Sequence, residues 1–180
     1  MSRAKELAKV VTRYRVLSAE NYVRIRTLAE AIRDGFCAYL GSEGPPCVLL
    51  APPVGPFEPR DYADAAFSAP PAGFQPLAPI AFGLIVRVTP QGDWLRVVMR
   101  CAKEGETFRL SIAQGLDYSF KLPLAAGAPQ DFLEALYVHL RDYFQQAIDS
   151  YEQGEYGEHL IGFDVIRRPD TVSETPVAST

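Results

Sequence analysis

Four arginines with strand-like spacing are the side chains of this sequence best suited to bind a charged partner. A guanidinium group stays cationic at any physiological pH and holds carboxylate or phosphate groups through two parallel hydrogen bonds. Polar and apolar residues alternate between residues 82 and 122, and residues two apart on a strand share a face. The alternation places six side chains on one polar face, which we predict to bind a partner or an anion: Arg87, Trp94, Arg96, Arg100, Arg109 and Lys121.

The expected register places like charges opposite one another. A turn at residues 90–93 and a two-residue turn at 104–105 set Arg87 opposite Arg96 and Arg100 opposite Arg109. Directly opposed like charges cost up to roughly 1 kcal/mol per pair. We expect compensation from one of two sources. The first is water or nearby loop carboxylates, and the second is an anionic partner; the candidate carboxylates are Glu58, Asp61 and Asp64.

A second basic feature lies near the start of the sequence. Lys5, Lys9 and Arg13 are spaced by four residues and would form one stripe on a helix. Helices at membrane surfaces and nucleic-acid-binding arms share this pattern, as do ordinary solvated helix faces. We treat the stripe as a secondary candidate surface.

Charge is separated along the sequence. Residues 1–35 hold eight basic and four acidic residues, a net charge of +4, and the remainder carries −8, which together give the overall −4. Residues 142–164 contain six acidic residues and no lysine or arginine. The two ends either face each other, within one fold or across a dimer, or they form two recognition surfaces. The pI near 5.2 argues against general DNA coating.

Sequence signatures of common enzyme classes are missing. The sequence contains no GxSxG, GxxxxGK[ST], GxGxxG or HExxH motif. His139 is off the apolar stripe of a predicted helix, where a partly exposed side chain is expected rather than a catalytic base. Glu155, Glu158 and His159 could form a metal site, although a solvated turn is the favoured interpretation. We therefore predict no catalytic residue, no metal and no cofactor.

The cysteines and the apolar segments predict a compartment. Cys37, Cys47 and Cys101 form an odd, widely spaced set without a CxxC motif, which favours reduced thiols. Cys101 falls on the apolar face of its strand and should be buried. The sequence has no apolar stretch long enough to span a membrane and no secretory signal pattern near Met1, so we expect a cytoplasmic protein.

The elements that must position these residues follow from the apolar spacing. Two helices are expected over residues 7–17 and 22–40, with Ser18 capping the second and Gly41 ending it. A short strand is expected at residues 47–51. The segment 52–79 contains eight prolines together with large aromatic residues, so we expect a long connection that packs on the body.

The second half of the sequence predicts a sheet and a covering helix. Strands near residues 82–88, 94–101, 108–112 and 118–122 form a four-stranded antiparallel meander. A long helix around residues 133–151 covers its apolar face, and residues 159–167 suggest an edge strand. The predicted fold is α+β, with a single domain over residues 1–168, including the proline-rich loop 52–79, and a polar tail over residues 169–180.

Three functions are compatible with these features. The first is a non-catalytic interaction protein, such as a subunit, adaptor or immunity-type partner, that docks another protein or a second copy of itself through the arginine face. The second is a protein that binds nucleic acid or a phosphate ligand with the same arginines. The third is an enzyme with carboxylate acid and base groups under a proline-rich lid, with Tyr118 or His159 as a further group.

Overall fold

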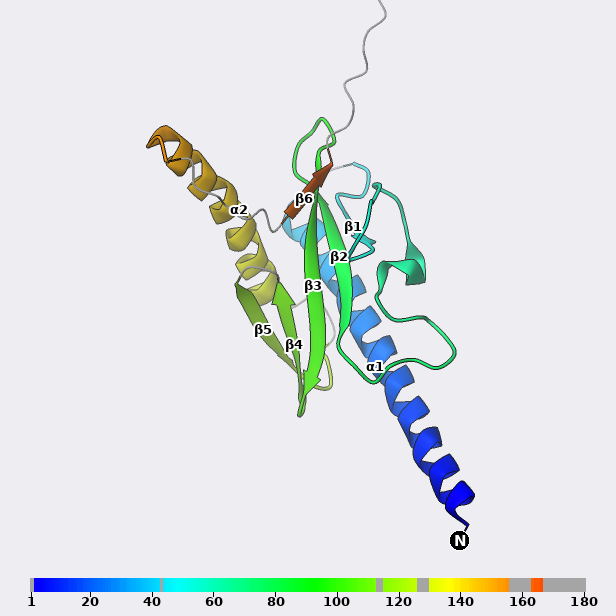
Figure 1. Cartoon of the computed structure of the whole chain (residues 1–180). Helices are drawn as coiled ribbons and strands as arrows, with labels where there is room; N and C mark the ends of the chain where they lie inside the picture. Colours follow the sequence, from blue (N-terminus) through cyan, green and yellow to red (C-terminus); the bar gives the residue numbers. More distant parts are fainter. Residues whose placement is uncertain (1, 43, 113–114, 126–129, 156–162, 167–180) are drawn as a thin grey trace, which may run out of the picture.

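The computed structural model describes residues 2–42, 44–112, 115–125, 130–155 and 163–166. Two long helices, a short 3-10 helix and six strands make up this part of the chain (Figure 1). In chain order the elements are α1 (Arg3–Tyr39), β1 (Val48–Ala51), η1 (Ala63–Ala66), β2 (Ile80–Arg87), β3 (Trp94–Glu104), β4 (Thr107–Ile112), β5 (Leu116–Lys121), α2 (Gln130–Glu152) and β6 (Phe163–Ile166).

The strands form one antiparallel sheet in the order β1-β2-β3-β4-β5, and β6 pairs with the beginning of β3. The predicted α+β class is confirmed, and β2 to β5 form the predicted meander. The sheet also includes β1 and β6, so it is larger than the four strands expected from the sequence. Among the segments that the structure describes, no helix is long and apolar enough to cross a membrane.

Both long helices pack on the same face of the sheet, which is their inner face (Figure 1). Residues at alternate positions of β2, β3 and β4, such as Leu84, Val97 and Leu110, are fully buried there. Ile32 of α1 and Leu136 of α2 reach the same cluster. The alternation in the sequence therefore correctly identifies the core side of each strand.

The expected pair of N-terminal helices is wrong, because α1 is one uninterrupted helix of 37 residues. Ser18 is not an N-cap. Its side chain is buried within the helix, where the hydroxyl donates to the carbonyl of Arg15 at 3.1 Å. This local bond gives the buried hydroxyl a hydrogen-bond partner within the helix, so the helix can continue through Ser18. The predicted stop at Gly41 is confirmed, with φ of 61° directly after the last turn.

The expected strand register is shifted by two residues at both turns. Arg87 lies opposite Trp94 rather than Arg96, and Arg100 lies opposite Ala81 and Ser111. Arg109 lies opposite Ala102 and Ser119. A shift of two residues keeps every side chain on its predicted face, and it separates the arginines that the expected register had opposed.

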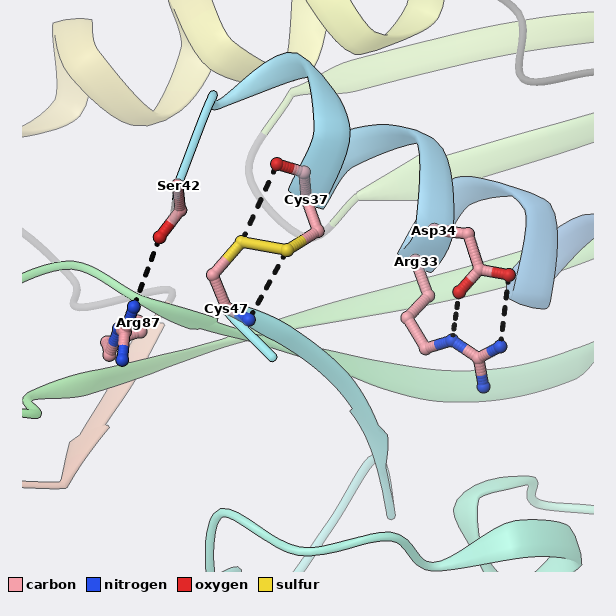
Figure 2. The surroundings of a disulfide bond; sticks show 6 residues. All are labelled: Arg33, Asp34, Cys37, Ser42, Cys47 and Arg87. Carbon is pink, nitrogen blue, oxygen red and sulfur yellow. Dashed lines mark hydrogen bonds and ion pairs between the residues drawn. A yellow bond between two sulfur atoms is a disulfide. The ribbon is translucent and has the colours of Figure 1, made fainter. Parts of the chain in front are cut away.

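The expectation of three reduced thiols is also wrong. Cys37, in the last turn of α1, forms a disulfide with Cys47, immediately before β1 (Figure 2). Their Cα atoms are 5.6 Å apart, which is a normal disulfide separation. Cys101 remains a free thiol and is buried in the core as predicted. The bond joins the end of α1 covalently to the edge of the sheet.

The proline-rich segment packs on the body, as predicted. Phe67 is buried against Phe82 and Tyr22, with ring centroids 5.8 and 5.7 Å apart. Phe57 is buried on the opposite side of the sheet. The segment therefore wraps around the β1–β2 edge and reaches both faces. The predicted tail over residues 169–180 lies outside the described residues. Glu158 and His159, two members of the possible metal site, also lie outside them.

Candidate functional site

The strand pairing places the six predicted binding residues on one face of the sheet, opposite the face that the helices cover. We call this the outer face. Arg87 and Trp94 are cross-strand neighbours on it, and Arg96 pairs with Ile85. Arg109 and Lys121 follow on β4 and β5, opposite Ser119 and Thr107 respectively. The predicted face is thus correct for all six residues, but their surroundings divide it into a covered and an open part.

Arg96 belongs to the covered part and is only 5% exposed. One terminal nitrogen of its guanidinium donates to the carbonyl of Pro52 at 3.1 Å and to the carbonyl of Gly55 at 2.7 Å. The group also lies over the ring of Phe57, 4.7 Å from its centroid. These contacts fasten the start of the proline-rich segment to the sheet, so Arg96 has a structural role and is not available to a partner.

A small apolar cluster surrounds Arg96 on the outer face. Trp94, Ile85 and Phe57 pack together there with Ala51. Trp94 is only 9% exposed, so its ring does not offer the stacking surface that a nucleic-acid base would need. The sequence does not show this second cluster, because Phe57 precedes Ile85 by 28 residues and Trp94 by 37 and reaches them only when the loop folds back onto the strands.

Gly83 leaves room for Arg96 to reach the carbonyl groups of Pro52 and Gly55. A Cβ atom at this position would lie 2.9 Å from the carbonyl oxygen of Ala51 and 3.1 Å from Cδ of Arg96. Both distances are shorter than ordinary contacts, so only glycine leaves room for the backbone and side chain to pass. A glycine inside an otherwise apolar strand is a recognised sign of such close approach, and it was the available signal in the sequence.

The open part of the outer face carries the other three cations. Arg100, Arg109 and Lys121 are exposed on β3, β4 and β5. Arg100 pairs with Ser111, which is two residues along β4 from Arg109. Arg109 pairs with Ser119, which is two residues along β5 from Lys121. The three side chains therefore lie on neighbouring cross-strand pairs of the outer face. Among the described residues, Arg100 and Lys121 have no ion pair or hydrogen-bonded partner. We call these three residues the open cationic patch.

Arg109 is the member of the patch whose charge is already paired. It binds Asp117 at 2.8 Å and lies 3.5 Å from Glu104. The hydrogen bond to Asp117 raises the pKa of Arg109 and, in return, lowers the pKa of Asp117. Both partners of the closer pair are about half exposed, so this pair contributes little to stability. The unpaired charge of the patch therefore comes from Arg100 and Lys121.

The loop carboxylates do not neutralise the arginine face as expected. Asp64 accepts hydrogen bonds from Tyr22, at 2.8 Å, and from Arg26, both on α1. Burial and the contact with Asp64 raise the pKa of Tyr22 to about 12. Asp61 accepts the backbone N–H of Ala63. Asp64 therefore holds the proline-rich segment against α1, whereas Asp61 bonds within the segment.

Arg87 lies at the margin of the outer face, where it is half-buried. Its guanidinium donates to the hydroxyl of Ser42 at 3.1 Å, just after α1 (Figure 2). The secondary basic stripe is far from this place. Lys5, Lys9 and Arg13 are exposed on the first half of α1, which extends beyond the sheet (Figure 1). The structure therefore does not combine the stripe with the patch.

The described residues considered for catalysis or reactivity, His139, Tyr118 and Cys101, lie in separate places and share no site. His139 is half-buried on α2, and desolvation lowers its pKa. Tyr118 packs in the core, 5.3 Å from the ring of Phe132. Burial raises the pKa of the Cys101 thiol to about 12, which keeps it protonated. Within the described part of the chain, no three His, Cys, Asp or Glu side chains gather where they could hold a metal ion.

Comparison with family models, curated proteins and solved structures finds no match for this chain.

Proposed function

We propose that this chain is a non-catalytic protein-interaction domain, such as a subunit, adaptor or immunity-type partner, that docks an acidic protein surface on the open cationic patch. The observation that supports this proposal is the division of the outer face. Arg96 and Trp94 are used to hold the proline-rich segment, whereas Arg100 and Lys121 are left exposed without a described partner. Unneutralised charges on a rigid sheet favour association with an oppositely charged surface.

The alternative of nucleic-acid or phosphate binding would use the same cations. Two observations favour a protein partner instead. Trp94 is buried and offers no stacking platform, and Glu104 and Asp117 lie within the patch, paired with Arg109. Carboxylates within the patch would repel a continuous phosphate backbone, whereas a protein surface can match mixed charges.

The test compares two polyanions of equal charge. Fluorescence anisotropy would measure binding of a labelled glutamate-rich peptide and of a labelled single-stranded oligonucleotide to the native chain and to the Arg100→Glu/Lys121→Glu variant. We expect the peptide to bind and the double reversal to weaken it at least about tenfold. Arg60→Glu, an exposed reversal on the proline-rich segment, serves as the control and should leave binding unchanged.

Equal peptide binding by the native chain and the double variant would contradict the proposed docking surface. Tighter binding of the oligonucleotide, with a steep loss of affinity as salt rises, would replace the proposal with the nucleic-acid alternative.

The cytoplasmic location remains a prediction, and the disulfide now bears on it. The cytosol keeps most protein thiols reduced, so a cytoplasmic chain should carry Cys37 and Cys47 as thiols, whereas an oxidising compartment would preserve their bond. Acid quenching of cells that express the protein, followed by thiol labelling and mass measurement, distinguishes the two. Labelling of all three cysteines without added reductant would support the cytoplasmic location.

A further inference from the structure

The apolar stripe of α1 continues past the end of the sheet. Positions 18 residues apart in an α-helix are five full turns apart and therefore face the same side. Four buried core residues of α1 have apolar counterparts 18 residues earlier, and those counterparts do not reach the core. The pairs are Ile25 with Leu7, Leu28 with Val10, Ala29 with Val11, and Ile32 with Tyr14.

Three of these earlier residues, Leu7, Val10 and Val11, are exposed. Leu7 is 65% exposed and Val10 is 62% exposed, and every described residue from 2 to 13 is solvent-accessible. The first contact of this stripe with the body is made by Tyr14, whose ring stacks on Phe74 at 5.3 Å. We call residues 3–17 the arm. On its core-like face, Leu7, Val10 and Val11 have no counterpart among the described residues of their own chain.

The end of α2 is similar. Leu133, Leu136 and Leu140 are buried, but the same stripe continues into residues that are exposed: Phe144 at 38%, Ile148 at 50% and Tyr151 at 68%. Beneath this end of α2 lies a groove of about 540 Å³ between α2, the last turn of α1 and the end of β2. Its apolar lining includes Phe36, Leu40, Val86, Leu140, Phe144 and Ile148. Arg87 and Arg141 also line the groove, so it offers apolar contact, and the acidic side chains lie farther along α2.

The two exposed stripes carry opposite charge. The arm contains five basic residues and one acidic residue, a net charge of +4: Arg3, Lys5, Lys9, Arg13 and Arg15 against Glu6. Residues 142–155 contain four acidic residues and no lysine or arginine: Asp142, Asp149, Glu152 and Glu155. Arg141 binds Asp142 at 2.8 Å, so the acidic charge of this stripe comes mainly from Asp149, Glu152 and Glu155. Each stripe therefore combines exposed apolar side chains with a charge opposite to that of the other stripe.

In the described part of one molecule the two stripes do not meet. The two helices meet where the end of α1 contacts the N-terminal part of α2, through a hydrogen bond from Tyr39 to Glu134 and the packing of Tyr39 against Tyr137. From that contact the arm and the acidic end of α2 extend in different directions, to opposite ends of the molecule (Figure 1). Among the described residues, the basic arm and the acidic end of α2 therefore do not pair with each other within one molecule.

We infer that the chain associates head to tail with a second copy of itself, with the arm of one molecule lying along the acidic end of α2 and the groove of the next. The arm is about 22 Å long and the stretch from Leu140 to Tyr151 is about 17 Å, so the arm is long enough to cover the exposed end of α2. Such a contact joins two different surfaces, so it produces a closed ring or dimer, or else an open filament. This surface is separate from the open cationic patch, and the inference does not depend on the proposed function.

The experiment measures the mass of the full chain by sedimentation velocity and native mass spectrometry. Two charge-reversed variants are compared with the native protein. The arm variant is Lys5→Glu/Lys9→Glu/Arg13→Glu, and the α2 variant is Asp142→Lys/Asp149→Lys/Glu152→Lys. We expect the native chain to form multiples of 19.9 kDa, and each reversal to weaken association at least about tenfold. A mixture of the two variants should associate again, because each then offers the charge that the other needs.

The control is Arg24→Glu/Arg60→Glu/Lys103→Glu, which makes the same change in net charge at exposed positions outside the arm. It should associate like the native chain, as should the Arg100→Glu/Lys121→Glu variant. A fourth variant, Leu7→Ser/Val10→Ser, removes exposed apolar groups that no core contact needs, and it should also weaken association.

Three results would overturn the inference: a native chain that stays monomeric at high concentration, reversals that leave association unchanged, or a mixture that fails to restore it. A monomer whose arm instead binds vesicles containing phosphatidylserine, and loses that binding in the arm variant, would identify the arm as a membrane-surface helix.

Discussion

Two side chains of similar appearance in the sequence, Arg96 and Arg100, have different roles because of what lies above them. Both alternate with apolar residues on β3, and both face outward. Arg96 is covered by the backbone of Pro52 and Gly55, whereas Arg100 is exposed. Strand periodicity gives the direction of a side chain, but it contains no information about a segment that is distant in the sequence. The outer face could be predicted, but not its division into two parts.

The close approach at Gly83 predicts a measurable cost for adding one methyl group. In Gly83→Ala the new Cβ would meet backbone carbonyl oxygens of β1 and the loop that follows it, which cannot rotate away as a side chain can. We expect the free energy of unfolding to fall by about 1–3 kcal/mol in chemical denaturation. Ser119→Ala, at an exposed position of the same face, should change it by less than about 0.5 kcal/mol. Equal stability of the two variants would contradict the described contact.

The buried thiol predicts loss of stability at alkaline pH. Burial raises the pKa of Cys101 from 9.0 to about 12, so folding favours the protonated thiol. This contribution is complete below pH 9, declines as the unfolded thiol ionises, and is lost as pH rises towards 12. Tyr22 acts in the same direction and over a similar range. Unfolding curves between pH 8 and 11 should therefore decline less steeply for Cys101→Ala than for the native chain, and parallel curves would contradict the assignment.

At the level of the elements, α1 shows why the boundaries of a helix are harder to predict than its faces. Ser18 is typical of an N-cap, and apolar residues stand on both sides of it at helical spacing. The same residue is acceptable inside a helix when its hydroxyl donates to a carbonyl one turn earlier, as it does here. Nothing local distinguishes the two cases, whereas Gly41 is unambiguous because its positive φ ends the helix.

The strand register shows a related limit. Alternation fixes which face a residue occupies, and a shift by two residues leaves that pattern unchanged. The turns at 88–93 and 105–106 decide the register, and their lengths are ambiguous in the sequence. The inner-face core and the helix around residues 133–151 were predictable because their periodicity extends over many residues.

The disulfide between Cys37 and Cys47 predicts a stability gain that depends on redox conditions. It closes a loop with a sequence separation of 10, and the chain-entropy relation gives about 2.7 kcal/mol for such a loop. Cys37→Ala/Cys47→Ala should therefore unfold at a lower temperature than the native chain and show the same midpoint with or without reductant. The native chain should fall to a similar midpoint when reduced. A native midpoint unaffected by reductant would contradict a structural role for the bond.

At the scale of the whole molecule, the contrast between the arm and the remainder of α1 predicts uneven hydrogen exchange. Residues 3–13 are exposed and make no described contact with the sheet, and a helix of that length is marginal when isolated in water. The stretch containing Ile25, Leu28 and Ile32 is fully buried. At low protein concentration the amides of the arm should exchange much faster than those of the buried stretch. Uniformly slow exchange along α1 under monomeric conditions would contradict the exposed position of the arm.

The covalent joint at the end of α1 also determines how the molecule would carry mechanical load. The helix is a rod of about 55 Å with its free half at one end and Cys37 in the last turn of the other. Tension applied to the arm would travel along the helix to Cys37 and pass through the sulfur atoms to Cys47, at the start of β1. The connecting residues 41–46 would then carry almost none of it. With the disulfide formed, the end of α1 is fixed to the start of β1. With the disulfide reduced, the same tension would extend residues 41–46 before any force acted on the sheet.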